Sequence, residues 1–185
     1  TQVLLSTYNG EKYLAQQLDS LLDQDYPEFT ILIRDDGSSD KTCDILSDYQ
    51  GRYSNITVIF ADNIGVTRSY YELLKQASGD LFALCDQDDV WLPGKLSRGV
   101  SMISACRNSS SSLYCSALQF VDSDLKYIGA AARPRYQCLE NAVMENIATG
   151  CTVIFGETLR QLFLQADPGK MHMHDWWFYL LASAF

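Results

Sequence analysis

Short apolar runs and helical patterns alternate along the first half of the sequence, and this alternation restricts the chain to few folds. The strand-like runs cover residues 3–6, 30–33, 56–60 and 81–85. Between them, apolar residues recur at the spacing of an amphipathic helix, as at Leu14, Leu18 and Leu21. Strands that alternate with helices pair in parallel through right-handed crossovers. We therefore predict an α/β fold with a Rossmann-like, mostly parallel sheet and helices on both of its faces.

The second half of the sequence is less regular. The expected helices cover residues 95–107, 140–147, 159–166 and 174 onward, and the expected strands cover residues 113–121 and 151–155. Residues 122–137 show no clear period and are expected to form a β-ribbon or a mobile loop. Because neither an internal repeat nor a linker divides the chain, we predict a single domain over residues 1–185.

Net charge and cysteine pattern exclude several classes of protein. The 185 residues include 14 Lys and Arg against 23 Asp and Glu, which gives a net charge of −9. This charge repels phosphate backbones and anionic lipid, so we expect no nucleic-acid partner. The six cysteines contain no Cys-x-x-Cys pair, which predicts reduced thiols in a cytoplasmic protein.

The ends of the chain bear on membrane association. The longest apolar run, residues 176–182, is far too short to cross a bilayer. The chain starts at Thr1 and stops at Phe185 inside an apolar run, so we expect both ends to be trimmed. A peripheral contact with the inner face of the cell membrane is expected only from segments beyond these ends.

Polar residues follow three of the predicted strands at the point where each strand ends. They are Thr7-Tyr8-Asn9, Asp35-Asp36 and Asp86-Gln87-Asp88-Asp89. Ligands of open α/β sheets bind beyond the carboxyl ends of the strands. We therefore expect these residues to surround one ligand site, where a carboxylate such as Asp35 or Asp36 accepts hydrogen bonds from a base N–H or a ribose hydroxyl.

Asp86, Asp88 and Asp89 are the most specific signal in the sequence. Carboxylates placed this close repel one another unless a cation is bound among them. Oxygen ligands favour Mg²⁺ or Mn²⁺ over zinc, and Mg²⁺ completes its shell with water and substrate phosphates. The run predicts Mg²⁺ or Mn²⁺ together with a diphosphate ligand. The alternative is a solvated acidic turn that caps the following helix.

Four segments together resemble the family 2 inverting glycosyltransferases, which have the GT-A fold. The segments are Ser6–Gly10, Asp35–Thr42, Asn63–Gly65 and Cys85–Trp91. The resemblance extends from Val3 to Ala184, and the tail is similar to bacterial rhamnosyltransferase-type enzymes of surface polysaccharide synthesis. It implies metal-dependent transfer of a sugar from a nucleotide-diphosphate donor to a hydroxyl of a saccharide or lipid-linked acceptor. Residues 1–100 would form the nucleotide-sugar half, and residues 101–185 would form an acceptor half that is truncated at its C-terminal end.

The resemblance also implies a role for each residue of these motifs. The residues for the donor are Thr7 and Asn9 in the nucleotide pocket, Asp35 and Asp36 at the base or ribose, Asp86 at the ribose or donor sugar, Asp88 at the metal, and Asp89 at the sugar or behind the metal ligands. Gly150 would let the backbone pass close to the acceptor sugar, although it also fits a simple turn before a strand.

The catalytic base of this family comes from an acidic motif that opens a helix, commonly Glu-Asp. The matching place here reads His174-Asp175-Trp176, so the first position departs from the pattern and the aspartate is kept. The resemblance implies that Asp175 accepts a proton from the acceptor hydroxyl, and that attack from the face opposite the nucleotide inverts the anomeric carbon. Trp176 is expected either to pack in the core or to form a stacking floor under a sugar.

Several alternatives remain open. His172 and His174 fit a metal cluster, a contact to phosphate or metal, or a polar loop, and Arg133 and Arg135 fit either screening of a diphosphate or solvation. A sugar-phosphate nucleotidylyltransferase would share the sheet and the metal, but it requires a Gly-rich loop with an arginine after the first strand. A catalytically inactive domain would bind the nucleotide-sugar without turnover.

Overall fold

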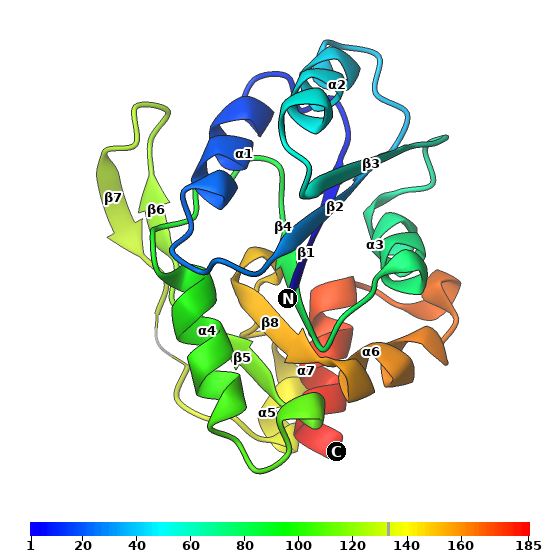
Figure 1. The fold of residues 1–185 in the computed structure, drawn as a ribbon. Helices are drawn as coiled ribbons and strands as arrows, with labels where there is room; N and C mark the ends of the chain where they lie inside the picture. Colours follow the sequence, from blue (N-terminus) through cyan, green and yellow to red (C-terminus); the bar gives the residue numbers. More distant parts are fainter. Residues whose placement is uncertain (133) are drawn as a thin grey trace.

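The computed structural model describes residues 1–132 and 134–185 and has a six-stranded sheet at its centre (Figure 1). The strands are β1 (Gln2–Thr7), β2 (Thr30–Asp35), β3 (Ile56–Phe60), β4 (Leu81–Cys85), β5 (Leu113–Cys115) and β8 (Val153–Gly156). Their order is β3-β2-β1-β4-β8-β5; the first four are parallel, and β8 is antiparallel to both of its neighbours. The predicted mostly parallel α/β sheet is confirmed.

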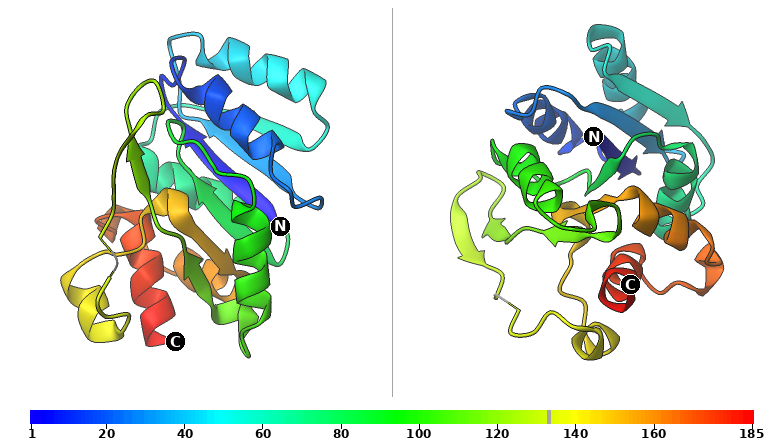
Figure 2. Two further views of the ribbon diagram at one scale, coloured as in Figure 1. Left: turned by 90° about the vertical axis from the view of Figure 1, so that its left-hand side faces the viewer. Right: turned by 60° about the horizontal axis from the view of Figure 1, so that its bottom comes forward.

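Helices cover both faces of this sheet (Figure 2). One face carries α1 (Leu14–Leu22), α2 (Thr42–Arg52) and α4 (Lys95–Ser104), and the other carries α3 (Val66–Gln76), α6 (Glu157–Leu164) and α7 (His174–Ala184). The short helix α5 (Leu139–Met144) packs against α7. Strand β1 serves both cores, because Val3 and Leu5 point to the α1 side and Leu4 points to the α7 side, as the pleat of a strand requires.

The second half differs from the expectation in two places. The strand expected over residues 113–121 is two strands, because the partner β8 begins at Val153, opposite Cys115, and the chain beyond has nothing to pair with in that sheet. It continues as β6 (Gln119–Val121), which pairs with β7 (Tyr127–Ala130) in a separate hairpin. The strand expected from residue 151 begins two residues later, because Gly150–Thr152 forms a 3-10 turn.

The hairpin confirms the β-ribbon alternative for residues 122–137 as far as β7. Arg133 lies outside the described residues, and Arg135 is exposed. All six cysteines are free, in agreement with the expected reduced thiols. None of the helices in the described part of the chain has the length and apolar character to cross a membrane.

Gly156 closes β8 against the turn at Ser109–Ser111. A Cβ added at Gly156 would lie 2.5 Å from Ser109 O and 2.5 Å from Cα and O of Ser110. We expect Gly156→Ala to lower the free energy of unfolding by about 1–3 kcal/mol, the usual range for overpacking, in a urea titration. Gly51→Ala in α2 is the control, since a Cβ there meets nothing within 4 Å and should raise stability by about 0.5–1 kcal/mol. Undiminished stability of Gly156→Ala would contradict this packing.

Candidate functional site

The carboxyl ends of β1, β2 and β4 open into a cavity of about 440 Å³, which we call the strand-edge cavity. Its lining residues are Ser6, Thr7, Tyr8, Asp36, Asn63, Gly65, Val66, Asp86, Gln87 and Asp88. The structure thus brings together four of the residues expected at the donor site, from three strand ends. The lining includes three carboxylates and no lysine or arginine.

Gln87 joins the loops that follow β1 and β4. Its Oε1 accepts hydrogen bonds from Thr7 Oγ1 at 2.6 Å and from the backbone N of Tyr8 at 2.9 Å. A Cβ at Gly10 would lie 2.6 Å from the same oxygen, so glycine is needed for this close approach. Sequence reasoning missed Gln87, because a glutamine between aspartates has no distinctive pattern of its own.

Asp36 is buried and holds the turn that forms one wall of the strand-edge cavity. Its carboxylate accepts hydrogen bonds from the backbone N of Ile64 at 3.1 Å and of Gly65 at 2.9 Å. It also pairs with the guanidinium of Arg34, which donates to Asp62 O at 2.9 Å. Arg34 is a buried cation that sequence reasoning missed, although its partner Asp36 is only two residues further along the chain, because the arginine stands inside an otherwise apolar strand.

Asp35 and Asn9 lie beside the strand-edge cavity and are not among its lining residues. Asp35 Oδ2 accepts from the backbone N of Gly37 and of Ser38, whereas its buried Oδ1 has no hydrogen-bond partner in the described part of the chain. Asn9 has a left-handed backbone with φ 50°, and its Oδ1 accepts from Ser39 N at 2.9 Å. These contacts join the loops after β1 and β2, and the unpaired Oδ1 is an acceptor that a ligand N–H or hydroxyl could satisfy.

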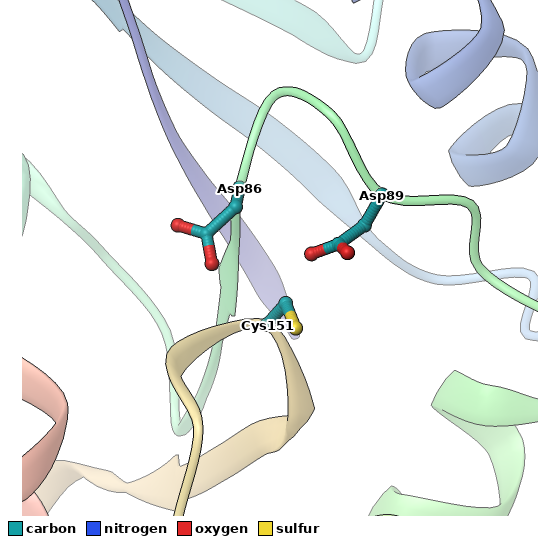
Figure 3. Close-up of side chains that lie close together, drawn as sticks. All are labelled: Asp86, Asp89 and Cys151. Carbon is teal, nitrogen blue, oxygen red and sulfur yellow. The ribbon is translucent and has the colours of Figure 1, made fainter. Parts of the chain in front are cut away.

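Asp86 lies where the strand-edge cavity meets the second half of the chain. Asp86, Asp89 and Cys151 lie together (Figure 3). One carboxylate oxygen from each aspartate and the Sγ of Cys151 are all within 4.8 Å of one another. Burial, and then the nearby carboxylate of Asp89, raise the pKa of Asp86 to about 6. Tyr70 donates its hydroxyl to Asp86 Oδ1 at 3.1 Å. Cys151 and Tyr70 were missed because apolar packing alone explains both of them in the sequence.

Asp88 and Asp89 differ in their surroundings. Asp88 is exposed at the strand-edge cavity, free to approach a cation in solution. Asp89 is partly buried, and this burial raises its pKa. The neighbouring Lys95 donates its ammonium to Cys151 O at 2.7 Å, and burial lowers the pKa of Lys95 to about 8.

Asp175 stands in the first turn of α7 and is 7% exposed. Its Oδ2 accepts from Gly150 N at 3.0 Å and its Oδ1 accepts from Trp176 N at 2.7 Å. The position that a Cβ of Gly150 would occupy lies 3.6 Å from Asp86 Oδ2 and 3.7 Å from Asp175 Cβ. The structure therefore places Asp175, Gly150 and Asp86 side by side, although they come from distant parts of the sequence.

His174 and Trp176 flank the candidate base. His174 is buried, its ring stacks on Tyr70 with centroids 4.1 Å apart, and burial lowers its pKa to about 4, so it is neutral at pH 7. Neither ring nitrogen has a hydrogen-bond partner within the described residues. Trp176 is partly buried and donates its indole N–H to Ala142 O at 2.7 Å, which ties α7 to α5. A stacking floor under a sugar stays a prediction for Trp176.

The acidic groups fit a hard divalent cation. Oxygen donors predominate, and the two lining carboxylates that have no cationic partner, those of Asp86 and Asp88, carry charge that Mg²⁺ or Mn²⁺ would offset. The His172 and His174 pair does not form a metal cluster: within the described residues, the one group of potential ligands is Asp86, Asp89 and Cys151.

Fold and site together define a class. The molecule is a Rossmann-like α/β protein whose acidic ligand site lies at the carboxyl ends of parallel strands, next to the place where antiparallel pairing begins. Its sequence matches the family model described as Glycosyl transferase family 2 over residues 2–130, and the chain belongs to this family.

Curated relatives match almost the whole chain. An uncharacterized glycosyltransferase of Rickettsia typhi is 24% identical, over 97% of this chain and 58% of its own length. The dTDP-rhamnosyl transferase RfbG of Shigella flexneri is 27% identical, over 96% of this chain and 64% of its own length. The UDP-Glc:alpha-D-GlcNAc-diphosphoundecaprenol beta-1,3-glucosyltransferase WfgD of Escherichia coli is 28% identical, over 96% and 67%. The chain therefore spans little more than half the length of the first of these relatives.

Solved structures share the fold. TarS of Staphylococcus aureus, residues 1–349, superposes with a TM-score of 0.76 at 24% identity, over 98% of this chain and 54% of that one. The mannosyltransferase PcManGT of Pyrobaculum calidifontis, in complex with GDP-Man and Mn²⁺, superposes with a TM-score of 0.71 at 19% identity. The match covers 95% of this chain and 49% of that one. These similarities confirm the predicted GT-A fold.

Proposed function

We propose that this chain is the catalytic part of a metal-dependent inverting glycosyltransferase. It would move a sugar from a nucleotide-diphosphate donor to a hydroxyl of a saccharide or lipid-linked acceptor, in the synthesis of bacterial surface polysaccharide. The observation that carries the proposal is the meeting of Asp175 with Asp86 around Gly150, at the border of the strand-edge cavity. Family membership and the reduced cysteines support a cytoplasmic transferase.

The strand-edge cavity is the proposed donor site. Thr7 lines it directly, Asp36 holds its wall, and Asn9 and Asp35 fix the adjoining loops, where Asp35 Oδ1 offers an acceptor to a base or ribose. Mn²⁺ or Mg²⁺ would be held by Asp88, with Asp86 nearby. When bound, such a cation offsets the negative charge that develops on the leaving diphosphate.

Asp175 is the proposed catalytic base. The N–H groups of Gly150 and Trp176 donate to its two carboxylate oxygens and fix the orientation of the side chain. It accepts the proton of the acceptor hydroxyl as that oxygen attacks the anomeric carbon, while the bond from this carbon to the diphosphate oxygen breaks. Gly150 lets the backbone pass close to Asp86 and Asp175, and Asp89 lies close enough to Asp86 to contact the same sugar.

The donor sugar is a finer proposal. RfbG is named for dTDP-rhamnose and WfgD for UDP-glucose, and the two are almost equally identical to this chain. These identities do not distinguish the two donors. We propose the rhamnosyltransferase-like branch from the resemblance of the Asp86–Trp91 motif and of the C-terminal tail. Donor sugars that are epimers differ in the contacts of a single hydroxyl group, so the donor has to be identified by measuring binding.

A thermal-shift panel tests the proposed donor site. We expect one of dTDP, UDP and GDP, or one of their sugars, to raise the melting temperature when Mn²⁺ is present and not in EDTA. A ligand at about 100 times its Kd stabilises by about 2.7 kcal/mol, which corresponds to a shift of several degrees. The same nucleotide should compete with its sugar conjugate. A panel without any Mn²⁺-dependent shift would contradict the proposed function, and binding without consumption of any donor would favour the inactive domain.

A further inference from the structure

One wall of the strand-edge cavity rests on a buried arginine. Arg34 stands in β2 two residues after Leu32, so the pleat of the strand turns both side chains to the same face, toward α3. The residue is 4% exposed, and its guanidinium pairs with the carboxylate of Asp36. The guanidinium also donates to Ser69 Oγ at 3.3 Å and to Asp62 O at 2.9 Å. One side chain therefore joins the end of β2, the turn after β3 and helix α3.

The contacts of Arg34 end on groups that shape the strand-edge cavity. Asp36 accepts a hydrogen bond from Gly65 N at 2.9 Å, and Ser69 Oγ accepts one from Ser6 Oγ at 2.6 Å. Asp36, Gly65 and Ser6 line the cavity, whereas Arg34 is not among the lining residues. Arg34 can therefore act on a ligand only through the residues that it holds in place.

The carboxylate of Asp36 is occupied by groups of the protein. Its Oδ1 accepts from Arg34 and from Ile64 N, and its Oδ2 accepts from Gly65 N. Because the guanidinium offsets the charge of this carboxylate, the pair adds no net charge to the strand-edge cavity. What the pair contributes is the position of the wall, since it fixes the turn over residues 62–65.

Stability alone is a weak reason for an arginine at this position. The desolvation of a buried ion pair is costly, and apolar residues of similar volume often give equal or higher stability. The three residues that precede Arg34 in β2 are all apolar. A fork that bonds to three segments instead holds the turn before a ligand arrives, and a pre-organised site loses less conformational entropy on binding.

We propose that Arg34 is a positioning residue for the donor, which keeps the turn over residues 62–65 in the shape that receives the nucleoside. This inference rests on the proposed function, which places the nucleoside at the end of β2 and the diphosphate at Asp88. Because Arg34 lies behind the wall and makes no contact with Asp88, it acts on nucleotide affinity and leaves the affinity for the ion unchanged. Lysine is a poor substitute, since its compact ammonium lacks the planar fork.

Arg34→Lys tests this inference in a calorimetric titration with the nucleoside diphosphate that the thermal-shift panel selects, in the presence of Mn²⁺. We expect Kd to rise at least about tenfold, because the bonds to Ser69 and to Asp62 O are not both kept and one hydrogen bond is worth roughly two- to tenfold. In transfer assays the loss should fall on the KM of the donor, with kcat at saturating donor within about threefold. The Kd of Mn²⁺ alone, measured by electron paramagnetic resonance, should stay within about twofold.

Arg160→Lys is the matched control. Arg160 also pairs with a carboxylate, that of Glu157, and donates to a backbone carbonyl, Leu74 O at 2.6 Å, but it is not among the lining residues of the strand-edge cavity. This variant should lower the melting temperature and leave the Kd of the nucleotide within about twofold. If Arg34→Lys does not fold, Ser69→Ala decides: it keeps the pair of Arg34 with Asp36 and should raise Kd by about threefold.

The opposite results would overturn the inference. An unchanged Kd in folded Arg34→Lys, or in Ser69→Ala where that variant decides, would show that the arginine only supports the fold. Fewer binding sites at an unchanged Kd would show the same, and an equal rise of Kd in Arg160→Lys would indicate a general loosening of the protein. If the unchanged protein binds no nucleotide of the panel, the proposed function fails as well, whereas nucleotide binding that is indifferent to Arg34 rejects this inference alone.

Discussion

Replacing Asp175 with asparagine is expected to slow sugar transfer by at least about a hundredfold, since a general base contributes roughly 10²–10⁴-fold to a rate. The amide keeps the shape of the side chain and loses the capacity to take a proton. Nucleotide affinity should stay within about twofold of that of the unchanged protein, because Asp175 is not among the residues that line the strand-edge cavity. The loss should therefore fall on kcat and leave donor binding intact.

The measurement combines transfer kinetics with the thermal-shift assay for the donor. Asp23→Asn is a suitable control, because the substitution removes the same charge. Asp23 is exposed at the end of α1 and makes no side-chain hydrogen bond in the described part of the chain. In Asp175→Asn the new amide nitrogen must face the N–H of Gly150 or of Trp176, so the melting temperature has to be recorded as well. Transfer that persists at more than about a third of the original rate would remove Asp175 from the mechanism.

Chelation of divalent cations is expected to reduce transfer to background and to weaken binding of the nucleoside diphosphate by more than about tenfold. The physical reason is the charge of the strand-edge cavity, where the carboxylates of Asp86 and Asp88 have no cationic partner among the lining residues, whereas Asp36 is paired with Arg34. A nucleoside without phosphates should keep its affinity in EDTA, because it brings no negative charge. Added Mn²⁺ should restore both transfer and diphosphate binding.

Asp88→Asn should reproduce much of this loss in the presence of metal. Titration of Mn²⁺ by electron paramagnetic resonance should show weaker binding of the ion, independently of turnover, because an exposed carboxylate ligand has been replaced by a neutral amide. Asp124→Asn at the tip of the β6–β7 hairpin removes an exposed charge far from the strand ends and serves as the control. Activity that is indifferent to chelation would exclude a role for the metal.

The strand ends could be predicted from the sequence because they obey a local rule. Buried parallel strands appear as short apolar runs, and the residues directly after each run must lie at one edge of the sheet. This rule places Thr7, Asp36, Asp86 and Asp88 together, and the structure confirms their proximity. The hairpin and the split of the strand over residues 113–121 were harder to foresee, because they depend on where β8 begins.

The partners of these residues could not be predicted, because they stand in segments whose own sequences look ordinary. Arg34 stands in an apolar strand, Tyr70 and Cys151 resemble core residues, and Lys95 resembles a helical surface lysine. Only the three-dimensional packing shows that Tyr70 bonds to Asp86 and that Lys95 bonds to the turn beside Gly150. Proximity of this kind has no local pattern from which it can be inferred.

The antiparallel pairing of β8 restricts changes of length in residues 150–156 more than in the β6–β7 hairpin. Leu81 pairs with Gly156 and Ala83 pairs with Ile154. The beginning of β8 therefore lies beside the carboxyl end of β4. One inserted residue in β8 would displace the Gly150–Thr152 turn by about 3.3 Å and exchange the side chains that face the two cores. In the part of the chain that the structure describes, β6 and β7 pair only with each other, so the length of their hairpin can vary without disturbing that alignment. The hairpin can therefore change in length, while the short interval from Gly150 to Gly156 must keep its length.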